Sequence, residues 1–335
     1  MPTAGLALPD LAAIRAAAGR IAPWVRRTPV LTSSSTDRRA GGHLFFKAEP
    51  FQRTGAFKFR GAANAVAALG GEVPAAGVVT HSSGNHGAAL ALAARLRGIP
   101  CRVVMPEGSP RVKREAVAGY GAEIVSCAAS AEAREETCSR LVAESGARLV
   151  HPYDDPEVIA GQGTAVLELL AEVGELAAVV VPIGGGGLAS GTALALAEAA
   201  PRTAVVGAEP AAADDAARSL ASGHRQGHPP GPVETIADGL KAPLSERTFQ
   251  ALSAHLREVV TVEEPAIVEA MRWVWERMKV VIEPSAAVAV AALLDGRLAA
   301  RLAAGQQGPP RIGVVLSGGN VDLDRLPWTA GRPAR

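Results

Sequence analysis

A lysine between two aromatic side chains is the first residue whose surroundings suggest chemistry. Lys58 lies between Phe57 and Phe59. Packing among apolar groups disfavours the charged ammonium, lowers the pKa of the amine and makes it a nucleophile for a carbonyl carbon. The plainer interpretation is a surface lysine whose methylene stem lies along the two rings. Taken alone, the segment favours this plainer interpretation, so Lys58 is a candidate that needs support from elsewhere in the chain.

A run of small and polar residues, SSGNHG at positions 82–87, lies between a predicted strand and a predicted helix. Free backbone N–H groups and the dipole at a helix start attract anions. The hydroxyls of Ser82 and Ser83 and the amide of Asn85 add further donors. Routine capping is the alternative, but it needs only one such residue. The run therefore favours a site for a substrate carboxylate.

Four consecutive glycines, Gly184–Gly187, connect a second predicted strand to a second predicted helix. A backbone without side chains can wrap an oxygen-rich anion such as phosphate. The same loop satisfies a loose dinucleotide fingerprint that ends at Ala189, and Glu209 lies where a ribose-binding acid is expected. On this loop alone, a nicotinamide-dependent dehydrogenase is a rival. Close packing of the helix on the strand would explain one glycine but not four.

A fourth segment, LSGGNVD at positions 316–322, again follows a predicted strand. Ser317 in this segment is suited either to cap a helix or to hydrogen-bond a buried ligand. The spacing does not distinguish the two.

The elements that position these loops alternate along the chain. Short runs that are apolar on both faces indicate parallel strands covered by helices, and in such sheets ligands bind at the carboxyl ends of the strands. The predicted strands are 44–47, 77–81, 101–105, 123–127, 177–182, 203–209 and 312–316, and the predicted helices are 56–69, 86–96, 110–119, 130–145, 158–170 and 188–199. The pattern predicts an α/β fold with parallel-rich open sheets flanked by helices.

Composition excludes several classes of protein. The 335 residues are 48% hydrophobic and carry a formal net charge of +1 with no basic cluster, so neither a nucleic acid nor a membrane is expected as a partner. The stretch from Leu11 to Ile21 reads as an amphipathic helix rather than a targeting segment or membrane span. The three cysteines show neither metal nor disulfide spacing, which predicts reduced thiols in a cytoplasmic protein.

Taken together, the loops resemble the fold-type II pyridoxal 5'-phosphate (PLP) family of threonine and serine dehydratases and serine racemases, which is tryptophan synthase β-like in fold. The resemblance runs from about Ala12 to Asp322. It depends on the segments TGAFKFRGA, SSGNHG, HPYDDPEVIAGQGT, VVVPIGGGGL, GAEPAAADDA, ETIADGLK, VWERMKVVIEPSAA and LSGGNVD, in the family's order. The dehydrogenase interpretation is therefore less favoured, because it gives Lys58 and Ser317 no role.

The resemblance implies how the cofactor is held. Lys58 is its covalent attachment point, and Phe57 lies against its ring. Asn85 donates to its phenolic oxygen, Gly184–Gly187 bind its phosphate, and Ser317 faces its pyridine nitrogen.

The resemblance also implies how the substrate is held. Its carboxylate is expected to bind Ser82, Ser83, Asn85 and His86, and Arg134 joins them when a small domain closes. That domain is expected at residues 76–155, with 1–75 and 156–335 forming the large PLP-binding domain. A homodimer is expected.

A divalent cation is a further expectation. Glu209, the carbonyl oxygen of Ala213 and Asp215 supply the hard oxygen ligands that Mg²⁺ or Ca²⁺ prefers, and they match a metal site of serine racemases and several dehydratases. Two solvated acids on a loop are the alternative.

The expected activity is dehydration of L-threonine, L-serine or a related β-hydroxy-amino acid to a 2-oxo acid and ammonia, with Lys58 as the base. Serine racemase and 3-hydroxyaspartate dehydratase are the alternatives. Ser83 lies where racemases carry the proton donor for the opposite face of the α-carbon. Tyr153 and Ala242, however, depart from the asparagine and serine of animal serine racemases, so elimination is expected to exceed racemisation.

Overall fold

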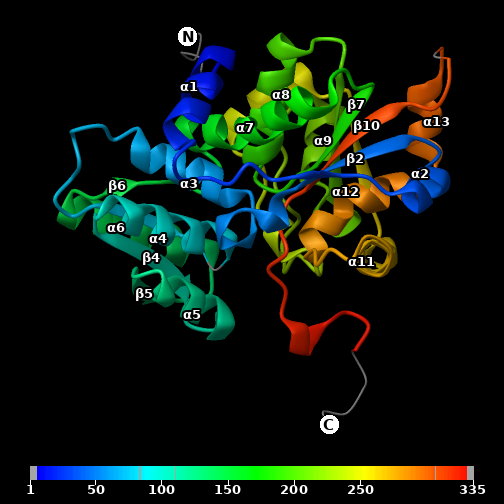
Figure 1. Cartoon of the computed structure of the whole chain (residues 1–335). Helices are drawn as coiled ribbons and strands as arrows, with labels where there is room; N and C mark the ends of the chain where they lie inside the picture. The colour runs from blue at the N-terminus through cyan, green and yellow to red at the C-terminus, as the bar shows by residue number, and fades with distance from the viewer. Residues whose placement is uncertain (1–5, 83, 110, 306, 330–335) are drawn as a thin grey trace.

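Two separate β-sheets organise the chain, as Figure 1 shows. The computed structural model describes residues 6–329 apart from 83, 110 and 306. A six-stranded sheet has the order β1-β2-β10-β7-β8-β9, and a four-stranded sheet has the order β5-β4-β3-β6. The strands are β1 (Val30–Leu31), β2 (His43–Ala48), β3 (Val78–His81), β4 (Cys101–Pro106), β5 (Glu123–Cys127), β6 (Arg148–Leu149), β7 (Ala178–Pro182), β8 (Ala204–Pro210), β9 (Glu258–Val262) and β10 (Arg311–Leu316).

Helices cover both faces of the sheets. The α-helices are α1 (Leu11–Ile21), α2 (Ser34–Ala40), α3 (Lys58–Ala67), α4 (Asn85–Arg97), α5 (Arg111–Gly119), α6 (Ala131–Ser145), α7 (Pro156–Val173), α8 (Gly187–Ala199), α9 (Asp215–Ser222), α10 (Glu246–His255), α11 (Glu264–Met278), α12 (Pro284–Leu294) and α13 (Arg297–Ala303). Short 3-10 helices are η1 (Glu49–Phe51), η2 (Arg53–Gly55), η3 (Ala211–Ala213), η4 (Asp238–Leu240) and η5 (Leu323–Arg325). In the described part of the chain, no helix has both the length and the apolar character needed to cross a membrane.

Parallel pairing dominates, as the strand pattern predicts. The paired strands run parallel except for β1 and β2, which pair antiparallel at the edge of the larger sheet. Every residue of β7 is buried, because α7 and α8 pack on one face of the sheet and α12 on the other. The predicted α/β fold with parallel-rich sheets is confirmed.

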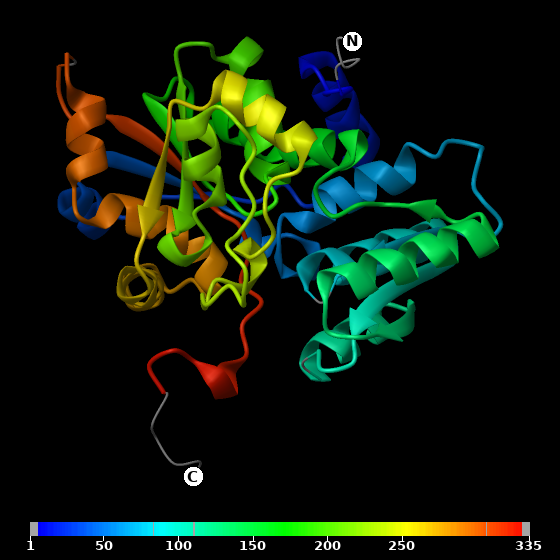
Figure 2. The same cartoon turned by 180° about the vertical axis from the view of Figure 1, so that it is seen from behind.

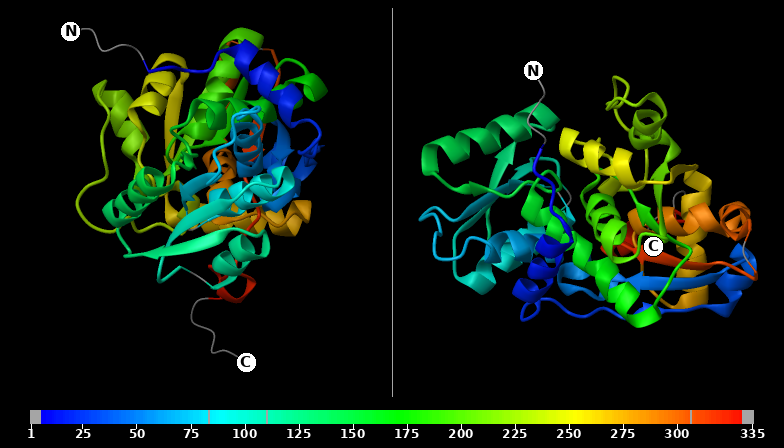
Figure 3. Two further views of the ribbon diagram at one scale, coloured as in Figure 1. Left: turned by 90° about the vertical axis from the view of Figure 1, so that its left-hand side faces the viewer. Right: turned by 90° about the horizontal axis from the view of Figure 1, so that it is seen from above.

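The two sheets form two units that lie side by side, seen from behind in Figure 2 and from above in Figure 3. The unit with the four-stranded sheet contains α4, α5 and α6, and its strands lie between Val78 and Leu149. Helix α3 packs against α4 of the smaller unit and against α7 of the larger one. A residue at the start of α3 therefore lies where the two units meet.

Several elements were not predicted from the sequence. Strand β9 is only half buried and β6 has two residues, so neither presents the apolar run that marks a central strand. Strands β1 and β6 are both edge strands, which need fewer apolar residues.

Candidate active site

Lys58 lies at the first position of α3, and the end of β10 fixes that position. The backbone N–H of Phe57 donates to the carbonyl oxygen of Ser317 at 3.0 Å, and Ala56 pairs with Gly318 in an isolated bridge. The Lys58 Nζ donates to the carbonyl oxygen of Pro152 at 2.8 Å. The loop before α3, the end of β10 and the loop after β6 therefore converge on one amine.

The electrostatic surroundings of Lys58 match the desolvated lysine rather than the surface one. Burial lowers the pKa of the Lys58 amine to about 8, although the charge of Glu283 acts in the opposite direction. The Nζ lies 5.1 Å from the centroid of the Phe57 ring. A neutral amine is thus accessible close to physiological pH, as a nucleophile or general base requires.

A buried ionic cluster anchors α3 two residues beyond Lys58. The Arg60 guanidinium donates to both carboxylate oxygens of Glu49 at 2.8 Å and to both of Glu168 at 2.8 Å. Lys47 donates to Glu168 at 2.6 Å and, like Arg60, is fully buried. Two cations thus face two anions, so the cluster is neutral, and it ties α3 to β2 and α7.

The glycine loop at the start of α8 has no room for side chains. A Cβ on Gly184 would lie 2.8 Å from the Leu240 Cα, and one on Gly186 would lie 2.7 Å from the Thr248 Cβ. At Gly185 and Gly187 the obstacle is Tyr153. Gly186 also has φ 86°, which favours glycine. The loop therefore presents bare backbone at a helix start, as a phosphate site needs.

The predicted carboxylate site begins α4, and Ser83 in it lies outside the described residues. The Ser82 hydroxyl accepts the N–H of Gly84 at 3.2 Å, and Asn85 is the first residue of α4. The His86 ring is directed elsewhere, since its Nε2 lies 3.2 Å from the carbonyl oxygen of Val150 and donates to it. Burial lowers the His86 pKa well below its usual value, so the ring is neutral and its Nδ1 is an acceptor. His86 can therefore offer an anion only its backbone N–H.

Ser317, the residue after β10, is buried. Residues 317–322 continue without helical structure, so the capping role left open by the sequence does not apply. Its backbone carbonyl oxygen accepts the N–H of Phe57, so Ser317 lies next to the residue that precedes Lys58.

Arg134 lies in α6 of the smaller unit. Its Nε donates to the carbonyl oxygen of Ser130 at 3.3 Å. Burial and then the charge of Arg134 lower the pKa of His81, at the end of β3, to about 4. Arg134 thus lies close enough to the carboxyl ends of the small sheet to act on groups there.

Sequence reasoning missed Glu283 and Asn320. The Asn85 Nδ2 donates to Glu283 Oε1 at 2.8 Å, and the Asn320 Nδ2 donates to Asn85 Oδ1 at 2.9 Å. Burial, followed by the charge of Asp238, raises the Glu283 pKa to about 8. Both residues stand in segments that carried the resemblance, IEPSAA and LSGGN, but nothing local marks either as a neighbour of Asn85.

Two of the predicted metal ligands lie near the end of β8: Glu209 belongs to that strand, and Asp215, whose charge acts on Glu209, begins α9. Glu209 accepts backbone N–H groups from Ala216 at 3.2 Å and Ala217 at 2.7 Å, and Asp215 accepts that of Leu244 at 2.9 Å. Both carboxylates are buried, and burial raises the pKa of each, that of Glu209 to about 8. Within residues 6–329, and leaving out 83, 110 and 306, no three His, Cys, Asp or Glu side chains are placed to share an ion.

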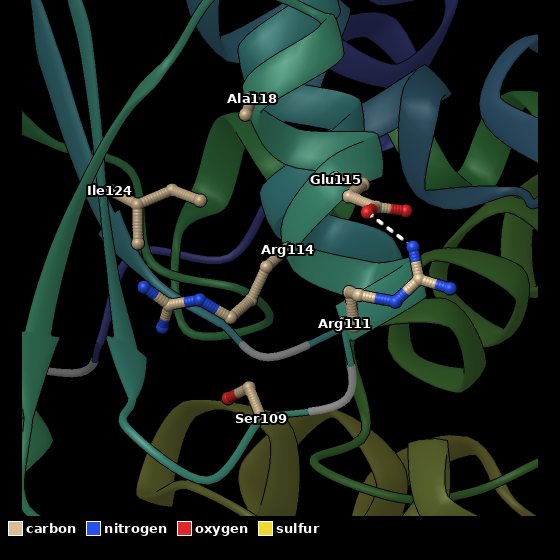
Figure 4. Close-up of a pocket in the computed structure, with 6 residues that line it drawn as sticks. All are labelled: Ser109, Arg111, Arg114, Glu115, Ala118 and Ile124. Atoms are coloured by element: carbon tan, nitrogen blue, oxygen red, sulfur yellow. Dashed lines mark hydrogen bonds and ion pairs between the residues drawn. The ribbon is translucent and has the colours of Figure 1, made fainter.

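A separate surface pocket of about 370 Å³ lies on the smaller unit, between α5 and β5. Figure 4 shows Arg111 paired with Glu115, at a distance of 2.6 Å, and Arg114 extending from α5 towards the strand that carries Ile124. None of the residues that line the pocket belongs to the predicted site.

The fold and the site together define a class: an α/β enzyme with a desolvated lysine and a glycine phosphate loop. The family model "Pyridoxal-phosphate dependent enzyme" matches residues 21–318. This chain belongs to that family. The predicted fold-type II PLP enzyme is thereby confirmed, with PLP as its cofactor.

Characterised relatives cover nearly the whole chain. The beta-hydroxyaspartate dehydratase of Paracoccus denitrificans (strain Pd 1222) is 48% identical over 321 residues, 96% of this chain and 99% of that protein. The structure of maize serine racemase has a TM-score of 0.91 at 46% identity and covers 95% of each chain. The structure of the T.th. threonine deaminase has a TM-score of 0.87 at 44% identity and covers 94% of this chain and 99% of that one. The expected class, a PLP enzyme of hydroxy-amino acids, agrees with all three.

The residues present fit the cofactor. A Cβ at any position of Gly184–Gly187 would lie within 3.0 Å of a neighbouring residue, so only bare backbone N–H groups can stand at this helix start, as a phosphate site needs. Lys58 supplies an amine whose pKa burial lowers to about 8. Ser317 and Asn85 supply uncharged polar groups on neighbouring loops.

Proposed function

We propose that this protein is a PLP-dependent ammonia-lyase that dehydrates a small β-hydroxy-amino acid, L-threonine, L-serine or 3-hydroxyaspartate, to a 2-oxo acid and ammonia. The observation that carries the proposal is the convergence on Lys58 of the loop before α3, the end of β10 and the loop after β6. When bound, PLP supplies an electron-withdrawing ring that weakens the Cα–H bond of an attached amino acid.

Lys58 is the residue that holds the cofactor and moves the α-proton. Its neutral amine accepts that proton at Nζ, and the pKa of about 8 keeps the amine near the balance between its two forms at working pH. The Pro152 carbonyl oxygen, 2.8 Å from Nζ, holds the amine in place. Loss of the β-hydroxyl as water then leaves an enamine product that hydrolyses to the oxo acid and ammonia.

The start of α4 holds the substrate carboxylate in this proposal. Ser82 and Ser83 contribute side-chain hydroxyls, and Asn85 and His86 contribute their backbone N–H groups at the helix start. Residues 76–155 act as the small domain that closes over the substrate and brings Arg134 towards it. Closure excludes water from the amine and the carboxylate alike.

The test is direct. The purified protein should absorb in the visible range, and borohydride reduction followed by peptide mapping should place the cofactor on Lys58. Oxo-acid formation is then measured with L-threonine, L-serine and 3-hydroxyaspartate. A label on another lysine, or full turnover by Lys58→Ala, contradicts the proposal.

Racemisation is the second candidate, because several relatives of 45–48% identity are named serine racemases. Ser83 is the proposed proton donor on the face opposite Lys58. Chiral analysis of L-serine incubations should show D-serine that disappears in Ser83→Ala while dehydration survives. If the wild type yields only pyruvate, Ser83 is a carboxylate-binding residue.

A Mg²⁺ or Ca²⁺ ion at Glu209, Asp215 and the Ala213 carbonyl is a further part of the proposal. Two buried carboxylates near each other are unfavourable without a cation. We therefore expect EDTA to remove an ion from Glu209 and Asp215 and, by doing so, to lower the melting temperature of the protein. An unchanged melting temperature and no copurifying metal would exclude the site.

A cytoplasmic homodimer completes the proposal. The three cysteines are free and buried, in keeping with a reducing compartment. Phe51 and Val281 are 45% and 47% exposed. Val281 and Pro50, the residue before Phe51, both lie against Gly319, so exposed apolar side chains are available in that region. Light scattering on the purified protein measures the stoichiometry.

A further inference from the structure

Glu283 is a buried carboxyl group that the proposed mechanism does not use. It is 4% exposed and stands at the N-cap of α12, yet its side chain makes no capping hydrogen bond. Its Oε1 instead accepts the Nδ2–H of Asn85, 198 residues away, at 2.8 Å. An acidic side chain buried at a helix start without capping it needs another explanation.

The Asn85 amide is held from both sides. Glu283 accepts from its nitrogen, while its oxygen accepts the Asn320 Nδ2–H at 2.9 Å. The Asn320 Nδ2 also donates to the carbonyl oxygen of Thr54 at 2.7 Å. If the Asn85 amide turned by 180°, its oxygen would face an acceptor and its nitrogen a donor. The Asn320 contact would then be lost, and the Glu283 contact would survive only if the carboxyl proton moved to Oε1, so both partners favour the observed orientation.

One donor remains on Asn85 after these contacts. Its Nδ2 carries two hydrogens, of which Glu283 uses one. The Asn85 amide lies near the segment that leads into Lys58, because Asn320 donates both to Asn85 and to the carbonyl oxygen of Thr54. The second N–H is therefore available to a ligand held at Lys58.

We infer that Glu283 is a positioning residue for PLP, which orients the Asn85 amide so that its free N–H is presented to the cofactor. This inference rests on the proposed role of Lys58 as the cofactor's attachment point. Asn320 is the second half of the same clamp.

The protonation state of Glu283 decides which variants test the inference. Burial raises its pKa to about 8, so at pH 7 the group is mostly the neutral acid. A neutral carboxyl still accepts at its carbonyl oxygen, and the amide oxygen of glutamine can do the same. Glu283→Gln therefore preserves the orientation, whereas Glu283→Leu keeps volume and removes the acceptor.

A matched control is available in the neighbouring helix. Glu263 is also a helix N-cap, at the start of α11, with a proline in the first turn and no side-chain capping bond, but it is exposed. Glu263→Leu therefore makes the same substitution, glutamate to leucine at a helix N-cap, at a position that does not contact Asn85. Asn320→Ala provides a variant at an exposed side chain that loosens the other side of the clamp and leaves the core intact.

The measurements use the holoenzyme: the dissociation constant of PLP, its visible absorption maximum and the melting temperature. Glu283→Leu should weaken PLP binding roughly tenfold, the equivalent of one hydrogen bond, and shift the absorption maximum. Asn320→Ala should act in the same direction, and the two effects should not add, because both act through one amide. Glu283→Gln and Glu263→Leu should stay close to the wild type in both cofactor measurements.

The inference is overturned if Asn320→Ala, together with any folded Glu283→Leu protein, binds PLP with wild-type affinity and spectrum. Equal losses in Glu283→Gln and Glu283→Leu also overturn it, since the charge rather than the acceptor would then matter. A wild-type protein that binds no PLP refutes the proposed function itself.

Discussion

Replacing Arg60 by methionine should destabilise the protein far more than removing an exposed arginine. Methionine keeps most of the apolar stem but deletes six hydrogen bonds, two to each of the carboxylates Glu49 and Glu168 and one each to Thr28 and Thr164. The cluster then holds two buried anions against the single cation Lys47.

The size of the effect follows from burial. The side chains of Arg60, Glu49 and Lys47 are inaccessible to solvent, and Glu168 is 19% exposed. Removing one partner from such a buried ionic cluster lowers the free energy of unfolding by about 3–5 kcal/mol. An exposed pair such as Arg20–Glu157, with side chains 36% and 40% exposed, contributes only about 0–1 kcal/mol.

The assay is urea unfolding of the cofactor-free protein, so that PLP binding does not add to the measured free energy. Arg20→Met serves as the control. Combining Arg60→Met with Glu49→Gln removes one anion and should recover part of the loss. If Arg60→Met costs no more than Arg20→Met, the buried cluster does not anchor α3, and our reasoning about the position of Lys58 fails.

Three further outcomes are expected. Burial lowers the pKa of Lys58 to about 8, so the fraction of neutral amine increases as the pH rises through 8. The rate at which the cofactor-free protein captures PLP, measured by stopped flow, should therefore have its midpoint near pH 8. A midpoint near the usual lysine value of 10.5 would mean an ordinary exposed lysine. Gly185→Ala places a methyl group against Tyr153 and should weaken PLP binding at least ~tenfold. Gly19→Ala is the control, because a Cβ there meets no atom within 4 Å and PLP binding should not change. Equilibrium dialysis compares the two variants. Burial raises the pKa of Cys101 to about 12, so the native protein should react with a thiol reagent at pH 7 only after unfolding, and rapid labelling would show that the smaller unit opens readily.

The sequence by itself determined the fold class and the chemistry of the loops. Runs such as Ala178–Pro182, apolar at every position, can only be strands buried on both faces, and the residues that follow them must lie at the carboxyl ends of a parallel sheet. Four glycines in one such loop have few uses other than a close backbone approach to an anion. Eight segments that stand in the order of a known family, one of them containing Lys58, were enough to identify the cofactor.

The edge strands were harder to predict from the sequence than the central strands. Strand β9 consists mostly of half-buried residues, and β1 is recognisable only because β2 pairs with it. The identity of each depends on pairing with another strand, β8 for β9 and β2 for β1, and no pattern within the segment itself records that partner.

Tertiary structure alone decided which polar groups meet. Asn85 and Glu283 are 198 residues apart, and Lys58 is 94 residues from the carbonyl of Pro152. His86 reads as a donor to the substrate in its SSGNHG segment, yet the fold directs its ring to Val150. A hydrogen bond is set by distance and direction within a few tenths of an ångström, and these follow from packing of whole elements rather than from residue type.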